Sequence, residues 1–247
     1  MEIFGGASGA DTRKPNAEKR KQIGSPEIED LREPFRVILK KLRGEIDSGE
    51  FSVIIGDDAS GRVPALVMYR FLKAIYEEAG RPKPSAFFIA GTNSSFFGLK
   101  ERRDKAAKVA EFFEHVGVTR SNSPERVSEE GRAVLVVTDT VATGKSLESV
   151  CGALRERGAP FVIASIGMVG SGNGLEEELG GKIVGGAFGT PRIYGAQDLG
   201  GVEKNPGEVF SHRYFKKKGE GRDVLEARNE DINVLVGELK EWYKANR

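Results

Sequence analysis

The stretch from Ala133 to Ser149, AVLVVTDTVATGKSLES, decides how this chain folds. Its first five residues are apolar and predict a buried strand, and the polar run Thr138-Asp139-Thr140 follows. A turn at Ala142-Thr143-Gly144 then leads to a helix that we expect to open at Lys145-Ser146. A strand, a turn of small residues and a helix N-terminus bring backbone N–H groups and hydroxyls to one point. The stretch therefore predicts a site for an anion such as a phosphate.

The tripeptide Gly144-Lys145-Ser146 after a strand is also found in the phosphate loop of nucleoside triphosphatases. That loop has a second glycine five residues before the first residue of the tripeptide, and here Asp139 occupies this position. The sequence therefore excludes a triphosphatase loop. From the residues alone, an ordinary strand, turn and helix with a polar cap remains an alternative.

The stretch resembles the phosphoribosyl-diphosphate loop of the type I phosphoribosyltransferases. In that loop a run of four apolar residues precedes two acidic positions, two hydrophobic positions and a Thr-Gly turn with a following Ser or Thr. Asp139 matches the second acid, the run Thr143 to Ser146 matches the turn, and Ala142 matches adenine-type members. Thr138 departs, because the family usually has a carboxylate there. The resemblance covers roughly residues 51–169 and implies an α/β fold, with a mainly parallel, Rossmann-like sheet flanked by helices.

The resemblance also implies a reaction: transfer of a 5-phosphoribosyl group between diphosphate and a nitrogen acceptor similar to a nucleobase. Mg²⁺ would be bound through the sugar hydroxyls and the diphosphate, with no direct protein ligand. Asp139 would accept hydrogen bonds from the ribose hydroxyls and act in catalysis, where positioning and electrostatics provide most of the rate. The residues implied to bind the phosphate and the phosphoribosyl group are Thr138, Asp139, Thr140, Ala142, Thr143, Gly144, Lys145 and Ser146.

A second strand with a polar end precedes this loop in the sequence. Ser52 to Ile55 predict a buried strand, and a turn rich in Asp and Gly separates it from a helix that opens near Pro64. In the family, the loop at this place holds the diphosphate and often has an acidic-small-Arg-Gly pattern. The similar residues here, with serine where arginine is common, are Asp58, Ala59, Ser60, Gly61 and Arg62. From the residues alone, an ordinary helix cap is the alternative.

Basic residues between the two loops are candidates for closing the site. Family members have a mobile basic loop hereabouts that covers the diphosphate and excludes water. Lys100 and Arg102, with Arg103 beside them, are the catalytic candidates that the resemblance implies. A solvated helix face with alternating charges is the alternative from the residues alone.

The remaining elements predict one domain with terminal additions. Residues 1–24 are expected to form a mobile arm, residues 25–169 the α/β core, and residues 170–247 an irregular, hood-like segment and a C-terminal helix of the same domain. Ser25-Pro26 predicts a helix start, and Pro34 predicts a kink or restart. In the family, the acceptor base is recognised by a variable hood. Four aromatic residues could stack on an acceptor, although packing is favoured for most of them: Tyr194, Phe210, Tyr214 and Phe215.

Composition restricts the partners and the compartment. The 247 residues are 30% charged with a net charge of +1, which gives no argument for nucleic acid or an acidic membrane surface. The single cysteine, Cys151, excludes an internal disulfide, and its apolar neighbours at helical spacing predict that it is buried. Neither a membrane-spanning run nor a signal-peptide core is expected, which suggests the cytoplasm.

Three functions stay open at this level. The first is a phosphoribosyltransferase that binds 5-phosphoribosyl diphosphate and that could form a homodimer, as many relatives do. Ala142 lacks the carboxylate of some purine enzymes, so adenine, orotate, another base or a non-base acceptor are the open choices. The second is a regulatory or nucleotide-binding protein that keeps the fold without turnover, which Thr138 favours. The third is a phosphoribosyl hydrolase or a phosphate sensor.

Overall fold

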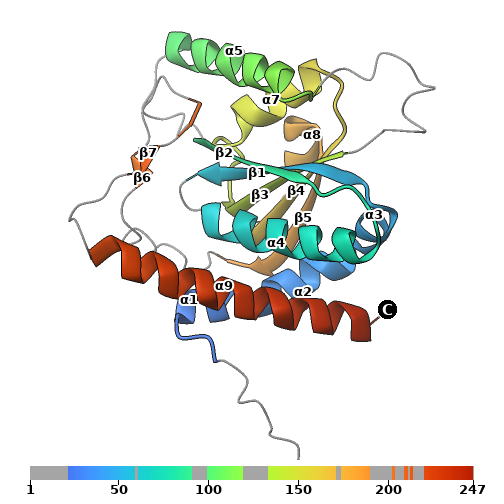
Figure 1. The fold of residues 1–247 in the computed structure, drawn as a ribbon. Coiled ribbons are helices and arrows are strands. Elements are labelled where there is room, and N and C mark those ends of the chain that lie inside the picture. Colours follow the sequence, from blue (N-terminus) through green and yellow to red (C-terminus); the bar gives the residue numbers. More distant parts are fainter. Residues whose placement is uncertain are drawn as a thin grey trace, which may run out of the picture.

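A parallel sheet of five strands forms the centre of the chain (Figure 1). This computed structural model describes residues 22–58, 61–90, 99–118, 133–170, 174–189, 202–203, 209–210, 212–213 and 220–246. The strand order is β2-β1-β3-β4-β5, so the predicted α/β fold with a mainly parallel sheet is confirmed. The strands are β1 (Phe51–Asp58), β2 (Ser85–Ala90), β3 (Ala133–Val141), β4 (Phe161–Met168) and β5 (Lys182–Phe188), with a separate antiparallel pair β6 (Val202–Glu203) and β7 (His212–Arg213).

Helices cover both faces of the sheet (Figure 1). One face packs on α1 to α4 and α9, and the other packs on α5, α7 and α8. Within the described residues, no helix is both long enough and apolar enough to cross a membrane. The helices are α1 (Pro26–Glu29), α2 (Arg32–Lys41), α3 (Arg43–Ser48), α4 (Arg62–Glu78), α5 (Leu99–His115), α7 (Glu148–Glu156), α8 (Leu175–Leu179) and α9 (Glu220–Ala245).

The central strand β3 shows why the sheet has two covered faces. Its residues alternate between the two hydrophobic cores: Leu135 and Val137 face the core beneath α2, α4 and α9, and Val134 and Val136 face the core beneath α5 and α7. Both sets are buried, so the strand is a continuous apolar run, which is typical of a central parallel strand. The edge strand β5 is much more exposed.

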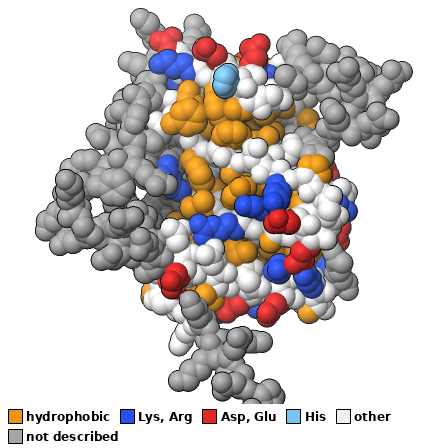
Figure 2. Space-filling view, viewed as in Figure 1, with side chains coloured by type: hydrophobic (Ala, Val, Ile, Leu, Met, Phe, Trp, Pro, Cys, Tyr) orange, Lys and Arg blue, Asp and Glu red, His pale blue; other side chains and the backbone are white. Residues whose placement is uncertain are grey.

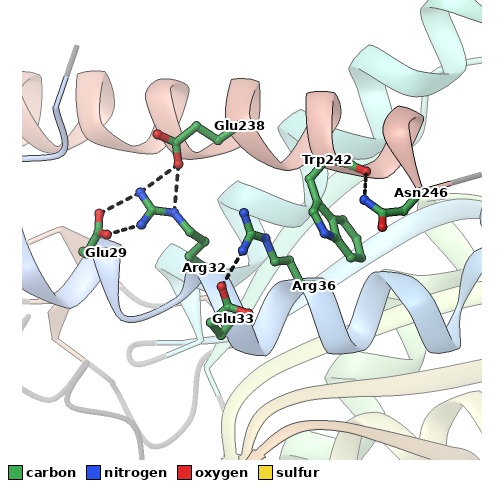
Figure 3. Close-up of polar contacts among 7 residues, drawn as sticks. All are labelled: Glu29, Arg32, Glu33, Arg36, Glu238, Trp242 and Asn246. Atoms are coloured by element: carbon green, nitrogen blue, oxygen red, sulfur yellow. Dashed lines mark hydrogen bonds and ion pairs between the residues drawn. The ribbon is translucent and has the colours of Figure 1, made fainter. Parts of the chain in front are cut away.

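The C-terminal helix α9 closes the sheet face that α1, α2 and α4 cover. Figure 3 shows Arg32 of α2 between Glu29 of α1 and Glu238 of α9, and its Nε donates to Glu238 Oε2 over 2.9 Å. The guanidinium of Arg36 lies 5.7 Å from the centre of the Trp242 ring. These contacts attach the C-terminal helix α9 to the N-terminal helices α1 and α2.

The predicted elements differ from the observed ones mainly at their ends. The first helix begins at Pro26 as predicted, and the chain restarts as α2 with Pro34 in its first turn, where a missing N–H costs least. Strand β3 continues to Val141, so Thr138 to Thr140 belong to the strand. The helix expected to open at Lys145-Ser146 opens at Glu148 instead. The domain boundaries after residues 24 and 169 stay a prediction.

Candidate functional site

The carboxyl ends of β1 and β3 form the candidate site. After β1 the chain crosses to β2 on one side, whereas β3 continues to β4 and β5 on the other side. The order therefore reverses between β1 and β3, and open α/β sheets bind ligands at such a switch point. Both loops that the sequence selected follow these two strands, so the fold brings them to the same edge.

Two carboxylates and a hydroxyl meet at this edge. Oγ1 of Thr138 lies 3.3 Å from Oδ2 of Asp57 and 3.3 Å from Oδ1 of Asp139. The exposed fractions of Asp57, Thr138 and Asp139 are 6%, 0% and 3%. Oδ2 of Asp139 and the hydroxyl of Thr140 are buried, and neither has a hydrogen-bond partner within the described part of the chain. A buried acceptor without a donor is costly, so Oδ2 of Asp139 is an acceptor whose hydrogen-bonding capacity is unused in this part of the chain.

Asp57 is a site residue that the sequence reasoning missed. The motif comparison selected its neighbour Asp58, whose side chain lies outside the described part. In the sheet, Gly56 pairs with Val137, so Asp57 follows in line with Thr138 on the adjacent strand. A prediction that extended the first strand to Asp58 and paired it with β3 would have placed Asp57 beside Thr138.

The turn after β3 presents backbone donors. Ala142, Thr143 and Lys145 are exposed, and Gly144 has a positive φ of 70°, where glycine is favoured. Within the described residues, the backbone N–H groups of positions 143 to 146 donate no hydrogen bond to another backbone carbonyl. The next amide, that of Leu147, donates to the carbonyl of Gly144 over 2.9 Å. A row of available N–H groups beside a lysine suits an anion.

The loop after β1 has a partly structural role. The amide N–H of Gly61 donates to the carbonyl of Asp57 over 2.8 Å. Gly61 is one of the residues predicted to bind the diphosphate, but its N–H is already used in this hydrogen bond within the chain. The guanidinium of Arg62 lies 5.1 Å from the centre of the Phe88 ring, on β2. Ala59 and Ser60 lie outside the described residues.

The basic candidates lie on α5. Lys100, Arg102 and Arg103 fall within this helix, and their side chains are outside the described part. Lys105, one turn further, is 2% exposed. Of the four proposed stacking aromatics, only Phe210 is described; its ring meets that of Phe112 edge to face at 4.9 Å. Phe210 therefore packs on Phe112 with one side of its ring, while 43% of the residue is exposed.

Cys151 lies beneath the site in α7. It is buried beside Val150 and Leu154, as the sequence predicted. Burial raises the pKa of its thiol to about 12, and the charge of Asp57 adds to this effect. Cys151 is therefore a packing residue and a poor nucleophile.

Two cavities lie away from the candidate site. One of about 420 Å³ is bordered by residues of α3, the end of α4 and the following turn. The other, of about 540 Å³, lies beside α5 in the region where Figure 2 shows hydrophobic side chains below a histidine. The lining residues are Arg43, Asp47, Ile75, Ala79 and Arg81 in the first cavity and Lys108, Glu111, Phe112, Glu114, His115 and Val209 in the second.

The donor set at the site suits a metal that arrives with its ligand. No group of three or more His, Cys, Asp or Glu residues that could hold a metal ion occurs within the described ranges. Asp139 still offers one buried carboxylate oxygen without a partner there, and carboxylate oxygen is a preferred ligand of Mg²⁺. The site therefore fits Mg²⁺ that is held mainly by phosphate and sugar oxygens. That Mg²⁺ binds here stays a prediction.

Comparisons with known proteins add little to this geometry. No family model matches the sequence, and no curated protein matches it. Among solved structures, a purine phosphoribosyltransferase from Pyrococcus horikoshii covers 66% of this chain and 80% of its own, with 17% sequence identity and a TM-score of 0.35. The protein TT1426 from Thermus thermophilus covers 86% of this chain and 97% of its own, with 18% identity and a TM-score of 0.35. Likeness at this level assigns no function to the chain.

Proposed function

We propose that this protein is a phosphoribosyltransferase-type enzyme that binds 5-phosphoribosyl diphosphate at the carboxyl ends of β1 and β3. One observation carries the proposal: a buried carboxylate oxygen of Asp139 that needs a donor lies on the strand that leads into a turn, exposed at Ala142, Thr143 and Lys145, whose N–H groups make no backbone hydrogen bond within the described residues. A sugar phosphate matches both parts of this site, because its hydroxyls can donate to the Asp139 carboxylate and its phosphate can accept from the N–H groups of the turn.

Each part of the site has a distinct task in this reaction. The N–H groups of residues 143 to 146 and the side chain of Lys145 bind the 5′-phosphate. Asp139 accepts hydrogen bonds from the ribose hydroxyls and fixes C1 of the ribose, the reacting carbon, where positive charge develops. Mg²⁺, when bound, supplies charge neutralisation of the departing diphosphate. Lys100 and Arg102 on α5 are proposed to cover the diphosphate and exclude water.

Calorimetric titration with 5-phosphoribosyl diphosphate and Mg²⁺ tests this proposal. We expect saturable binding by the wild type and a loss of roughly tenfold or more in Asp139→Ala, because a hydrogen bond to a charged group contributes about 1.5–3 kcal/mol. Asp231→Asn is the matched control, since Asp231 is a buried, hydrogen-bonded carboxylate on α9. No binding by the wild type at millimolar ligand would refute the proposal.

A regulatory protein without turnover is the second candidate. Two observations favour it: Thr138 stands in the place of a second carboxylate, and the N–H of Gly61 is bonded within the chain. Release of diphosphate in a screen of nitrogen acceptors separates the two functions, because only the enzyme releases it. Cytoplasmic location and a homodimer are further proposals that fractionation and light scattering can test.

A further inference from the structure

The hydroxyl of Thr138 has two acceptors and one hydrogen. Oδ2 of Asp57 and Oδ1 of Asp139 both lie 3.3 Å from Oγ1, and a threonine hydroxyl donates a single hydrogen bond. Thr138 is fully buried, so water does not compete for this hydrogen. The hydroxyl therefore donates either to the carboxylate on β1 or to the carboxylate on β3.

We propose that Asp57 is a positioning residue of this site, which accepts the hydrogen of Thr138 and so leaves Oδ1 of Asp139, in addition to Oδ2, which has no partner within the described residues, free to accept from a ligand. This inference rests on the proposed function and adds a residue of β1 to it. When sugar hydroxyls donate to Asp139, Thr138 turns its hydrogen to Asp57 at the same distance, and no buried donor loses its partner.

The sheet holds the three side chains ready for this exchange. Gly56 pairs with Val137 in the parallel register of β1 and β3, which places the next residues, Asp57 and Thr138, side by side. On its other side, Thr138 pairs with Ser165 of β4. Strand pairing therefore fixes the distance between the hydroxyl and its two acceptors, with no loop movement required.

A purely structural role for Asp57 is the competing explanation. The carboxylate of Asp57 lies close enough to Cys151 of α7 to affect its thiol electrostatically, so Asp57 could serve to seat this helix. In that case a substitution at Asp57 would lower the stability of the fold without acting through Thr138. The two explanations differ in whether the effects of Asp57 and Thr138 are coupled.

A double-mutant cycle measures this coupling. The variants are Asp57→Asn, Thr138→Val, both together, and Thr138→Ser, which keeps the hydroxyl; Asp231→Asn controls for loss of a buried carboxylate elsewhere. An asparagine accepts more weakly than a carboxylate and also donates, so Asp57→Asn directs the hydrogen of Thr138 to Asp139. Binding of 5-phosphoribosyl diphosphate with Mg²⁺ is measured by calorimetry, and the ¹³Cγ resonance of Asp139 is followed by NMR in the ligand-free protein.

We expect Asp57→Asn to weaken binding roughly tenfold, the scale of one hydrogen bond to a charged group. In the Thr138→Val background the same substitution should have little further effect, and Thr138→Ser should retain most of the affinity. The Asp139 resonance should move with Asp57→Asn when Thr138 is present and much less when valine replaces it. Thermal unfolding of each variant shows whether it is folded.

Additive effects of Asp57→Asn and Thr138→Val would overturn the inference, and so would unchanged binding in Asp57→Asn. If no variant, the wild type included, binds the ligand, the proposed function fails. The NMR experiment then still decides the inference at Asp57, because it needs no ligand. If the Asp57→Asn substitution leaves the chemical shift of the Asp139 resonance unchanged, the proposed transfer of the Thr138 hydrogen bond between Asp57 and Asp139 is refuted.

Discussion

Replacement of Gly61 by alanine tests the packing that joins the two strand ends of the site. A Cβ at this position would lie 2.4 Å from the carbonyl oxygen of Asp57 and 3.0 Å from that of Val137. Both atoms belong to the backbone of paired strands, so neither can turn away as a flexible side chain would. Alanine at position 61 therefore forces the loop away from the sheet.

The geometry sets the size of the effect. Ordinary contact begins at 3.4 Å, so the carbonyl of Asp57 and the new Cβ must separate by about 1 Å. Overpacking of this kind costs about 1–3 kcal/mol. The movement also stretches the 2.8 Å hydrogen bond from the Gly61 N–H to Asp57, which contributes about 1 kcal/mol. We expect Gly61→Ala to lower the free energy of unfolding by about 2–4 kcal/mol, or the melting temperature by roughly 5–15 °C.

Gly152 provides the matched control. It lies inside α7, and a Cβ there would meet no atom within 4 Å. Alanine is favoured over glycine in a helix by about 0.5–1 kcal/mol, so Gly152→Ala should stabilise the fold. The same chemical change is thus expected to have opposite signs at the two positions.

The assay is urea unfolding monitored by circular dichroism for the wild type, Gly61→Ala and Gly152→Ala. The free energies of unfolding are compared after checking that the three proteins have the same m-value. Gly61→Ala should also weaken ligand binding, because the displaced loop follows directly on Asp57. A free energy of unfolding for Gly61→Ala equal to that of the wild type would refute the reasoning. A shift of both variants in the same direction would refute it as well.

Three further predictions concern the rest of the molecule. Burial alone would raise the pKa of Asp231, but hydrogen bonds from Ser25 and Gly24 lower it overall. Asp231→Asn should therefore cost about 1 kcal/mol at pH 7, and urea unfolding should show that this difference fades as the pH falls through the lowered pKa. Cys151, with a pKa of about 12 against an ordinary 9.0, has roughly a thousandfold less thiolate, so a disulfide reagent should label it only after unfolding. Leu235→Ala, at a fully buried position of α9, should cost about 2–5 kcal/mol in urea unfolding, whereas removal of the surface ion pair of Lys240 should cost less than about 1 kcal/mol.

Local pattern was enough to predict the two buried strands of the site and the helices that begin near Pro26 and Pro64, because buried strands and amphipathic helices have distinct periodicities. It failed at the start of α7. Lys145 and Ser146 look like the first turn of a helix, but Gly144 takes a positive φ and its carbonyl accepts from Leu147, which closes a turn instead. The helix begins only at Glu148, where an acidic side chain suits the N-terminus.

Long-range geometry decided what the pattern could not. The apolar residues of the last helix place Trp242 on its inward face, and Trp242 does pack against the core, but it is only partly buried, whereas its neighbour Tyr243 is fully buried. The hydroxyl of Tyr243 donates to Asp47 over 3.0 Å, and its ring meets Phe71 edge to face. Which of two adjacent aromatics faces inward depends on how α9 is rotated against α4, and that angle comes from tertiary packing.

The position of Asp139 within a strand has a consequence for the chemistry of the site. Thr138 pairs with Ser165 and Thr140 with Gly167, so the backbone on both sides of Asp139 is held by β4. Its carboxylate is therefore fixed before any ligand arrives, and the entropy of ordering it has already been lost during folding. The donors of the exposed turn lie beyond the last paired residue and are less constrained. Under the proposed function, the sugar would therefore be bound by an acceptor that is fixed in the sheet, and the phosphate would be bound by a turn that can adjust to it.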